Sequence, residues 1–153
     1  MIILRQKLYS FKSESLDLID LGDNLNLVKT KPTIISKILG KLSKRVKEWQ
    51  GLCVMYDIML SSKNIGYIML NKESNEEINI PWFSVDSNYQ NNGYGTKALA
   101  AIIKYMRKLG YKWLTLEVPV ENKQAQHVYE KLGFKYTGEI IEDSLKLMRL
   151  KLK

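Results

Sequence analysis

The spacing of apolar residues changes along this chain of 153 residues, and the order of those changes restricts the fold more than any other feature of the sequence. Alternating or β-branched runs predict strands at 1–10, 52–60, 65–70, 77–85, 112–118, 134–142 and 145–151. Helical spacing predicts helices at 30–50, 95–109 and 122–132, and the stretch 11–24 is ambiguous, with local helical character around Ile19 and Asp20. Hairpins followed by strand–helix–strand–helix–strand predict an α/β (α+β) fold, a central mixed, mostly antiparallel sheet of six to seven strands flanked by about four helices.

Pro81 lies inside the predicted strand 77–85 and marks a local departure from regular pairing. Proline has no N–H to donate to a neighbouring strand, so we expect a bulge or a separation from the adjacent strand at this position. Simple alternation along the strand places Asn79, Phe83 and Val85 on the same face.

The composition is that of one globular domain, spanning residues 1–153. Apolar residues make up 45% of the chain and charged residues 26%, and no apolar run reaches the length of a membrane span, so we expect no membrane partner. Cys53 is the only cysteine, which excludes an internal disulfide and a thiolate metal cluster. We therefore expect a site without metal and, from the reducing conditions that a lone thiol fits, a cytoplasmic location.

The formal net charge of +8 fits either a lysine-rich solvated surface or a field that attracts an anionic ligand. Nucleic acid and a polyphosphate cofactor are both such ligands. The lysines are spread along the chain without a dense basic block or a nucleic-acid-binding motif, which disfavours nucleic acid as a partner.

The polar segment from Asp86 to Gly95 connects a predicted strand to a predicted amphipathic helix. A helix start has backbone N–H groups without intrahelical partners and carries a partial positive charge. Gly93 and Gly95 have no side chains to block the approach of a ligand. The segment therefore suits the binding of a phosphate group.

Glycine spacing alone leaves other interpretations of this segment open, including an ordinary turn-rich loop. A Walker phosphate loop is excluded because Thr96 and Lys97 stand in the wrong order. A dinucleotide fingerprint fits the spacing of residues 93–98, with Glu117 as its acidic residue. However, a long polar loop precedes the glycines, and too little chain follows Glu117 to complete a doubly wound sheet.

Two sequence signatures resemble those of the GNAT N-acetyltransferases. Residues 90–95 (Gln-Asn-Asn-Gly-Tyr-Gly) match the family pattern Q/R-x-x-G-x-G/A. Residues 122–134 match N-x-x-A-x-x-x-Y-x-x-x-G-F, and one helix and one strand fit between the two signatures. The resemblance covers about residues 77–138 and implies a GNAT-like fold with acetyl-CoA as co-substrate.

The resemblance also implies the role of individual residues. Tyr129 would be the general acid toward the departing thiolate, and Asn79 occupies the strand position where histone-type relatives carry a glutamate base. Because an amide cannot act as a base, Glu77, two residues earlier on the same face, is the candidate that could act through water. The expected contacts to acetyl-CoA are Phe83, Ser84, Val85, Gln90, Asn91, Asn92, Gly93, Tyr94, Gly95, Thr96, Asn122, Ala125 and Tyr129.

The expected reaction is direct transfer of an acetyl group from acetyl-CoA to a primary amine within a ternary complex. His127 is expected to face away from Tyr129, and neither it nor Cys53 has the partners of a nucleophile. The acceptor is a small-molecule or peptide amine that the sequence does not specify further, and the oligomeric state stays open, with a homodimer as one alternative. A non-catalytic acyl-CoA-binding or regulatory domain of the same fold is the alternative function, favoured by the absence of a carboxylate at Asn79.

Overall fold

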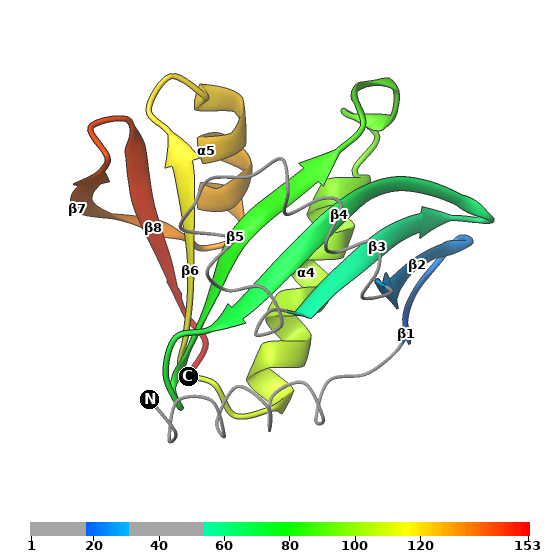
Figure 1. The fold of residues 1–153 in the computed structure, drawn as a ribbon, viewed down its shortest axis with the longest axis horizontal. Coiled ribbons are helices and arrows are strands. Elements are labelled where there is room, and N and C mark those ends of the chain that lie inside the picture. Colours follow the sequence, from blue (N-terminus) through cyan, green and yellow to red (C-terminus); the bar gives the residue numbers. More distant parts are fainter. Residues whose placement is uncertain (1–17, 31–53) are drawn as a thin grey trace.

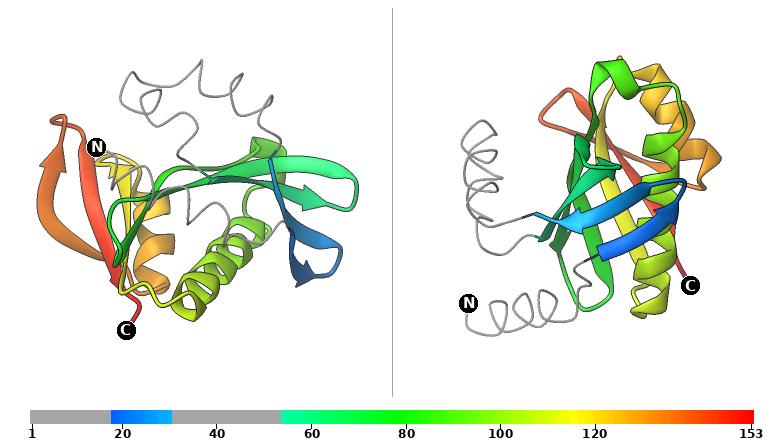
Figure 2. Two further views of the ribbon diagram at one scale, coloured as in Figure 1. Left: turned by 60° about the horizontal axis from the view of Figure 1, so that its bottom comes forward. Right: turned by 90° about the vertical axis from the view of Figure 1, so that its right-hand side faces the viewer.

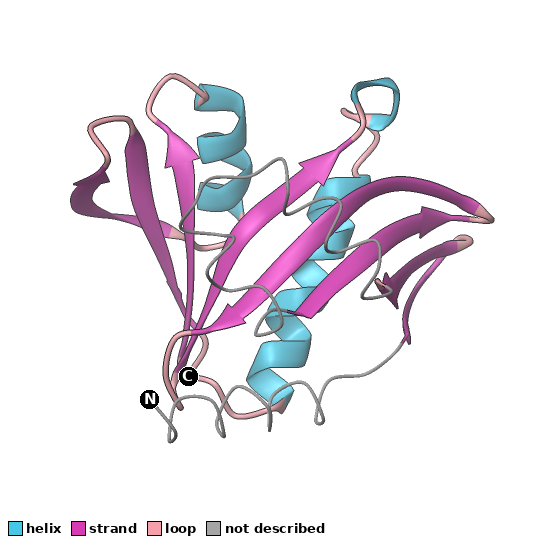
Figure 3. Cartoon of the chain, viewed as in Figure 1, coloured by secondary structure: helices cyan, strands magenta, loops and turns pink. Residues whose placement is uncertain are grey.

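The structure, a computed structural model, describes residues 18–30 and 54–153 (Figure 1). The predicted strand 1–10, the predicted helix 30–50 beyond its first residue, and Cys53 lie outside the described residues. Within the described part, one sheet of eight strands packs against two α-helices (Figure 3). The strands are β1 (Leu18–Gly22), β2 (Leu25–Lys29), β3 (Val54–Leu60), β4 (Lys63–Lys72), β5 (Glu77–Val85), β6 (Trp113–Pro119), β7 (Lys135–Ile141) and β8 (Leu145–Lys151).

The sheet is mixed, as predicted, but it has more strands than the six to seven expected. The strand order is β1-β2-β3-β4-β5-β6-β8-β7, and β5 with β6 is the parallel pair among otherwise antiparallel neighbours. The additional pair is the hairpin of β1 and β2, so the local helical character expected around Ile19 and Asp20 is wrong. Asp23 and Asn24 turn the hairpin with φ of 51° and 62°, a conformation that these two residue types tolerate well.

Both described helices lie on one face of the sheet, as the two views of Figure 2 show. They are α4 (Tyr94–Lys108) and α5 (Lys123–Lys131), where about four helices were expected for the whole chain. The predicted apolar stripe of α4 is confirmed: Leu99, Ile102 and Met106 are fully buried. Burial of each such side chain contributes about 1.5–3 kcal/mol, which holds α4 against the sheet. A further short 3₁₀ turn, η1 (Ser87–Tyr89), precedes α4.

The prediction made from Pro81 is confirmed twice. β5 pairs with β6 from Glu77 to Ile80, and none of the later residues of β5 pairs with β6, so the two strands diverge from Pro81 onward (Figure 1). On the other side of β5, the register with β4 shifts by one residue between Met69 and Asn71. One break in β5 therefore produces both a bulge and an opening between two parallel strands.

The bulge reverses the faces of β5, which corrects the simple alternation expected from the sequence. Asn79 lies opposite Asn71, whereas Phe83 lies opposite Ile68, which is part of the core under the helices. Asn79 and Phe83 therefore point to opposite sides of the sheet, because one extra residue changes the parity of the strand.

No helix in residues 18–30 or 54–153 is long and apolar enough to span a bilayer.

Candidate active site

The loop that precedes α4 is held by its own side chains. Gln90 Nε2 donates to the carbonyl oxygen of Val85 at 2.8 Å, and Asn92 Nδ2 donates to the carbonyl oxygen of Gln90 at 3.0 Å. Gly93 is the N-cap of α4 with a φ of 81°, and no side chain caps the helix start. The first amides of α4 therefore have neither an intrahelical partner nor a side-chain cap, which leaves them able to donate to a ligand.

Gly95 brings the start of α4 against the second half of β5. A Cβ atom on Gly95 would lie 3.3 Å from Phe83 Cζ and 3.3 Å from Val85 Cγ2, which is tighter than an ordinary contact. A larger residue here would force Phe83 or Val85 to shift, and the close approach places the helix amides next to the strand edge that β6 leaves unpaired.

Asn122 is the N-cap of α5, and its Oδ1 accepts from the backbone N–H of Ala125 at 3.1 Å. Gln124 Nε2, in the first turn of the same helix, donates to Asn91 Oδ1 at 2.7 Å. This hydrogen bond joins α5 to the loop before α4. Gln124 was not among the predicted site residues, because the signature of residues 122–134 leaves its position unspecified.

Tyr129 lies on α5 between two aromatic rings and is 9% exposed. Its ring centroid is 6.5 Å from that of Phe83 and 6.0 Å from that of Phe134, which packs edge-on. Burial raises the pKa of the Tyr129 phenol above its ordinary value of 10.0, so the O–H group keeps its proton throughout the neutral range. The geometry thus holds a proton donor beside the second half of β5.

The predicted cofactor residues line one hollow of about 380 Å³ between the diverging β5, the start of α4 and the start of α5. We call it the helix-side hollow. All of the predicted contacts except Asn92, whose side chain bonds within its own loop, belong to its lining. The full lining is Phe83, Ser84, Val85, Tyr89, Gln90, Asn91, Gly93, Tyr94, Gly95, Thr96, Asn122, Gln124, Ala125, Val128 and Tyr129.

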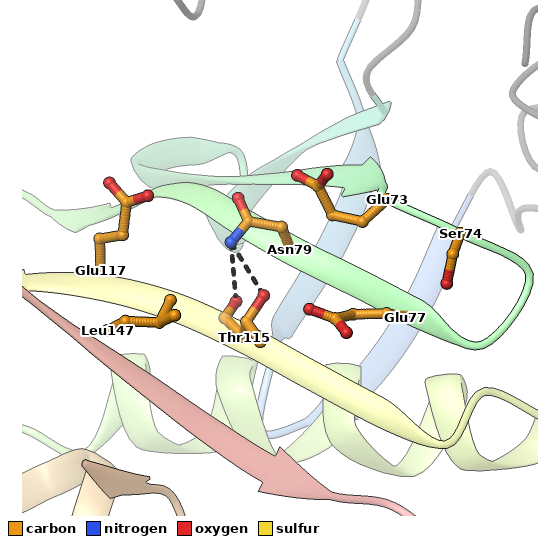
Figure 4. A pocket seen from close by; sticks show the side chains of 7 residues that line it. All are labelled: Glu73, Ser74, Glu77, Asn79, Thr115, Glu117 and Leu147. Carbon is orange, nitrogen blue, oxygen red and sulfur yellow. Dashed lines mark hydrogen bonds between the residues drawn. The ribbon is translucent and has the colours of Figure 1, made fainter. Parts of the chain in front are cut away.

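A second hollow, of about 500 Å³, lies over β5 and β6 on the other face of the sheet. We call it the far-face hollow, and Figure 4 shows its side chains. Thr115 and Glu117 of β6 alternate with Leu114 and Leu116, which are buried in the core with the helices, so the polar pair points away from α4 and α5. Its lining residues are Glu73, Ser74, Glu77, Asn79, Thr115, Glu117 and Leu147.

The two predicted base positions both lie in the far-face hollow, away from the predicted cofactor contacts. Glu77 forms an ion pair with Arg149 at 3.1 Å, and the Arg149 guanidinium stacks on the ring of Trp113 at 3.8 Å. Asn79 Nδ2 donates to Thr115 Oγ1 at 3.0 Å and points toward the Thr115 carbonyl oxygen at 3.4 Å. Neither residue shares a hollow with Tyr129.

Glu117 is the carboxylate that sequence reasoning considered only for the rejected dinucleotide site. Ile80 pairs with Leu116, so Glu117 is the first β6 residue beyond the paired region and faces the point where the strands diverge. Its alternation with Leu116 and Val118 is visible in the sequence, but its position at the opening depends on the register of β6 against β5. Glu73, from the β4–β5 turn, was missed for the same reason.

The described residues contain no group of three or more histidine, cysteine, aspartate and glutamate side chains that could hold a metal ion.

The family model described as the acetyltransferase (GNAT) family matches residues 30–134. The chain belongs to this family. The same range contains both sequence signatures and all of the residues that line the helix-side hollow, so the resemblance seen in the sequence is confirmed.

Relatives and solved structures agree with this assignment. The uncharacterized N-acetyltransferase YycN of Bacillus subtilis is 30% identical over 95 residues, covering 60% of this chain and 61% of that protein. The uncharacterized N-acetyltransferase MJ1207 of Methanocaldococcus jannaschii is 29% identical over 96 residues, covering 59% of this chain and 42% of that protein. The match thus spans 61% and 42% of the lengths of these relatives.

The fold is also that of a GNAT family acetyltransferase from Elizabethkingia anophelis solved with acetyl-CoA bound. The two chains share 18% identity with a TM-score of 0.71, and the alignment covers 84% of this chain and 99% of the other.

Proposed function

We propose that the protein transfers the acetyl group of acetyl-CoA directly to a primary amine. The observation that carries the proposal is the helix-side hollow, which combines the amides at the start of α4 with an unpaired strand edge and the buried Tyr129 phenol. Phosphate oxygens suit the helix amides, and an extended amide-containing arm suits an unpaired strand edge. A thioester near Tyr129 would then lie at the opening between β5 and β6.

The residues of the hollow fit this co-substrate. Side chains on Gly93 or Gly95 would occupy the helix start or press on Phe83 and Val85, so glycine keeps the approach clear. The second half of β5 pairs with β4 alone, which leaves its other edge available for hydrogen bonds, although the Val85 carbonyl oxygen already accepts from Gln90. Acetyl-CoA supplies the acetyl group as a thioester, and residues of this chain would supply the proton transfers and the stabilisation of the developing negative charge.

The transfer forms one C–N bond and breaks one C–S bond. The attacking nitrogen must first lose the proton of its ammonium form, and it loses a second proton as the amide forms. The Tyr129 O–H donates a proton to the departing sulfur, and backbone N–H groups along the unpaired edge of β5 can stabilise the carbonyl oxygen as it gains negative charge. One net proton is released to solvent for each ammonium that is acetylated.

Glu117 is the carboxylate best placed to accept the first proton, directly or through water. It faces the point where β5 and β6 diverge, where an amine entering from the far face would meet the thioester. Glu77 lies four residues further from the opening along the paired region. The base therefore belongs to β6 in this proposal, and Asn79 serves the acceptor rather than the proton transfer.

Replacing Tyr129 with phenylalanine tests the proposal. The Tyr129→Phe variant keeps the ring contacts with Phe83 and Phe134, so its stability and its affinity for CoA should change little. Loss of a general acid should lower the turnover number by about 100- to 10,000-fold. Tyr136→Phe, at an exposed tyrosine of β7, is the matched control and should keep full turnover.

The measurement is acetyl-CoA consumption over a screen of amines, with CoA affinity from calorimetry. If Tyr129→Phe had the same turnover number as the unmodified chain, Tyr129 could not be the general acid. CoA binding by the unmodified chain without turnover on any amine would instead favour the non-catalytic acyl-CoA-binding domain.

A further inference from the structure

The far-face hollow contains a buried pair of neutral polar side chains, Asn79 of β5 and Thr115 of β6 (Figure 4). The two residues lie opposite each other in the parallel pairing of these strands. Asn79 is 5% exposed and Thr115 is 3% exposed. Because buried polar groups normally have hydrogen-bond partners, the donors and acceptors that this pair leaves unused indicate what the hollow can bind.

The orientation of the Asn79 amide is fixed by the backbone beside it. Its Nδ2 lies 3.0 Å from Thr115 Oγ1 and 3.4 Å from the carbonyl oxygen of Thr115. A carbonyl oxygen can only accept a hydrogen bond, so the nitrogen of the amide, rather than its oxygen, faces Thr115. Asn79 Oδ1 lies on the other side of the amide and is buried without a hydrogen-bond partner (Figure 4). The pair therefore has one unused acceptor.

The Thr115 hydroxyl supplies a donor next to this acceptor. Its oxygen accepts from Asn79 Nδ2, so its proton is directed elsewhere, and within the described part of the chain it donates to no other group. An acceptor on β5 and a donor on β6 thus lie side by side in one hollow. Leaving either of them unsatisfied is unfavourable, which favours a ligand that completes both hydrogen bonds.

The chemistry of the two unused groups restricts the kind of ligand group that fits between them. An ammonium group only donates hydrogen bonds and a carboxylate only accepts them, so each would leave one member of the pair unsatisfied. Either charge would also lose hydration beside two neutral side chains. A hydroxyl group or an amide both donates and accepts. Water does so too, and a ligand group that reproduces both hydrogen bonds can displace it.

The backbone around the pair is already used by the sheet. Asn79 pairs with Asn71 of β4 on one side and with Thr115 on the other, and Thr115 pairs in turn with Arg149 of β8. No strand edge is open at this level of the sheet. Recognition of a ligand here must therefore come from the side chains of Asn79 and Thr115.

The position of the pair relative to the opening between β5 and β6 gives the spacing of a suitable ligand. Ile80 with Leu116 is the last pair of these two strands, and the opening begins at Pro81. Asn79 precedes Pro81 by two residues, which corresponds to about 7 Å along the strand. An amine at the opening and a second group at the pair would be separated by this length.

We propose that Asn79 and Thr115 together bind a neutral hydroxyl or amide group of the acceptor, at a distance of about 7 Å from its reacting amine. The bound group donates to Asn79 Oδ1 and accepts from the Thr115 hydroxyl. This inference rests on the proposed function, since it adds a second point of recognition for the acceptor of the same reaction.

Calorimetry on the full chain, with and without saturating CoA, tests the proposal. The probes are α,ω-amino alcohols of increasing length, ω-amino amides, and alkylamines in which a methyl group replaces the hydroxyl group. At the best length, the amino alcohol or the amino amide should bind about 5- to 30-fold more tightly than its matched alkylamine, the scale of one or two hydrogen bonds. The larger of the two gains identifies the group that the pair prefers.

The double variant Asn79→Leu/Thr115→Val replaces both partners by apolar side chains of similar shape, which should preserve folding. It should remove the preference over the alkylamine and leave the affinity for the alkylamine itself unchanged. Thr115→Val alone should reduce the preference about fivefold, the scale of one hydrogen bond. Thr137→Val, which removes an exposed hydroxyl of β7 outside both hollows, is the matched control and should keep the full preference.

Two results would overturn the inference. One is the absence of any preference for the hydroxyl or amide probes at every chain length, as expected if water keeps its place at the pair. The other is a preference that the double variant retains as fully as Thr137→Val does. The proposed function fails separately, through absent CoA binding or absent acetyl-CoA consumption on every amine, and the titrations without CoA are read independently of both.

Discussion

Replacing Gly93 with valine separates the contribution of this glycine to folding from its contribution to cofactor binding. Gly93 has a φ of 81°, a region that side-chain-bearing residues occupy at a cost of about 1–3 kcal/mol. A Cβ atom at this position would meet no other atom of the protein within 4 Å, so the loss of stability comes from backbone strain alone. The added side chain would instead extend into space that the helix-side hollow needs for its ligand.

Gly22 is a close match for this position. Its φ is 80°, an added Cβ would also meet nothing within 4 Å, and it lies in β1, outside the lining of the helix-side hollow. Gly22→Val should therefore lose about the same stability as Gly93→Val, measured by urea unfolding. The comparison removes backbone strain as an explanation for any difference in binding.

The expected difference in binding follows from the hydrogen bonds at the start of α4. Preventing even one charged phosphate oxygen from reaching its amide donor costs about 1.5–3 kcal/mol, which is roughly a 10- to 100-fold increase in the dissociation constant of CoA. Calorimetry should show this loss for Gly93→Val and none for Gly22→Val. A folded Gly93→Val variant with normal CoA affinity would refute the assignment of this loop to the pyrophosphate.

Three further variants or conditions test other parts of the structure. Gly66→Ala should lower the free energy of unfolding by at least about 1–3 kcal/mol in urea titrations, because the added Cβ would overlap the backbone carbonyl oxygen of Ser84 on β5. If the Gly66→Ala variant were as stable as the unmodified chain, β4 and β5 would have to be able to move apart at this point without cost. Gln124→Ala should weaken CoA binding about threefold to fivefold in calorimetry, because it removes the 2.7 Å hydrogen bond from Gln124 to Asn91. The free energy of unfolding should not change, because both side chains are exposed. Burial raises the pKa of Tyr129 above 10.0, so the unfolded chain loses the phenol proton first as the pH rises. The contribution of Tyr129 to the free energy of unfolding should therefore be constant below pH 10.0 and should decrease above it, so the stability of the unmodified chain should fall more steeply with pH there than that of Tyr129→Phe. Equal slopes for the two proteins above pH 10.0 would contradict the burial of the phenol.

The second half of the chain could be predicted closely because its apolar residues follow a clear helical or strand spacing and because glycine and proline mark the ends and breaks of its elements. The strand 77–85 and the strand 145–151 have the bounds found in the structure, and α4 and α5 each differ from prediction by a residue at either end. Pro81 predicted where β5 and β6 separate, because proline has no N–H group to donate to a neighbouring strand.

Features that depend on three-dimensional register were not accessible in the same way. The β1–β2 hairpin has only five residues in each strand, and its weak alternation was outweighed by local helical spacing. The bulge in β5 reversed the side of the sheet to which Asn79 points, and a single sequence does not reveal which strand accommodates the extra residue. Glu73 and Glu117 are distant in sequence and meet over one hollow only because β5 and β6 are neighbours.

The break in pairing at Pro81 separates β5 into two parts, which line hollows on opposite faces of the sheet. The residues before it contribute to the far-face hollow and the residues after it to the helix-side hollow, and the two linings share no residue. Substitutions in separate sites without common partners usually have additive effects. If the proposed function holds, substitutions that reshape the far-face hollow, such as one at Thr115, should leave the affinity for CoA unchanged.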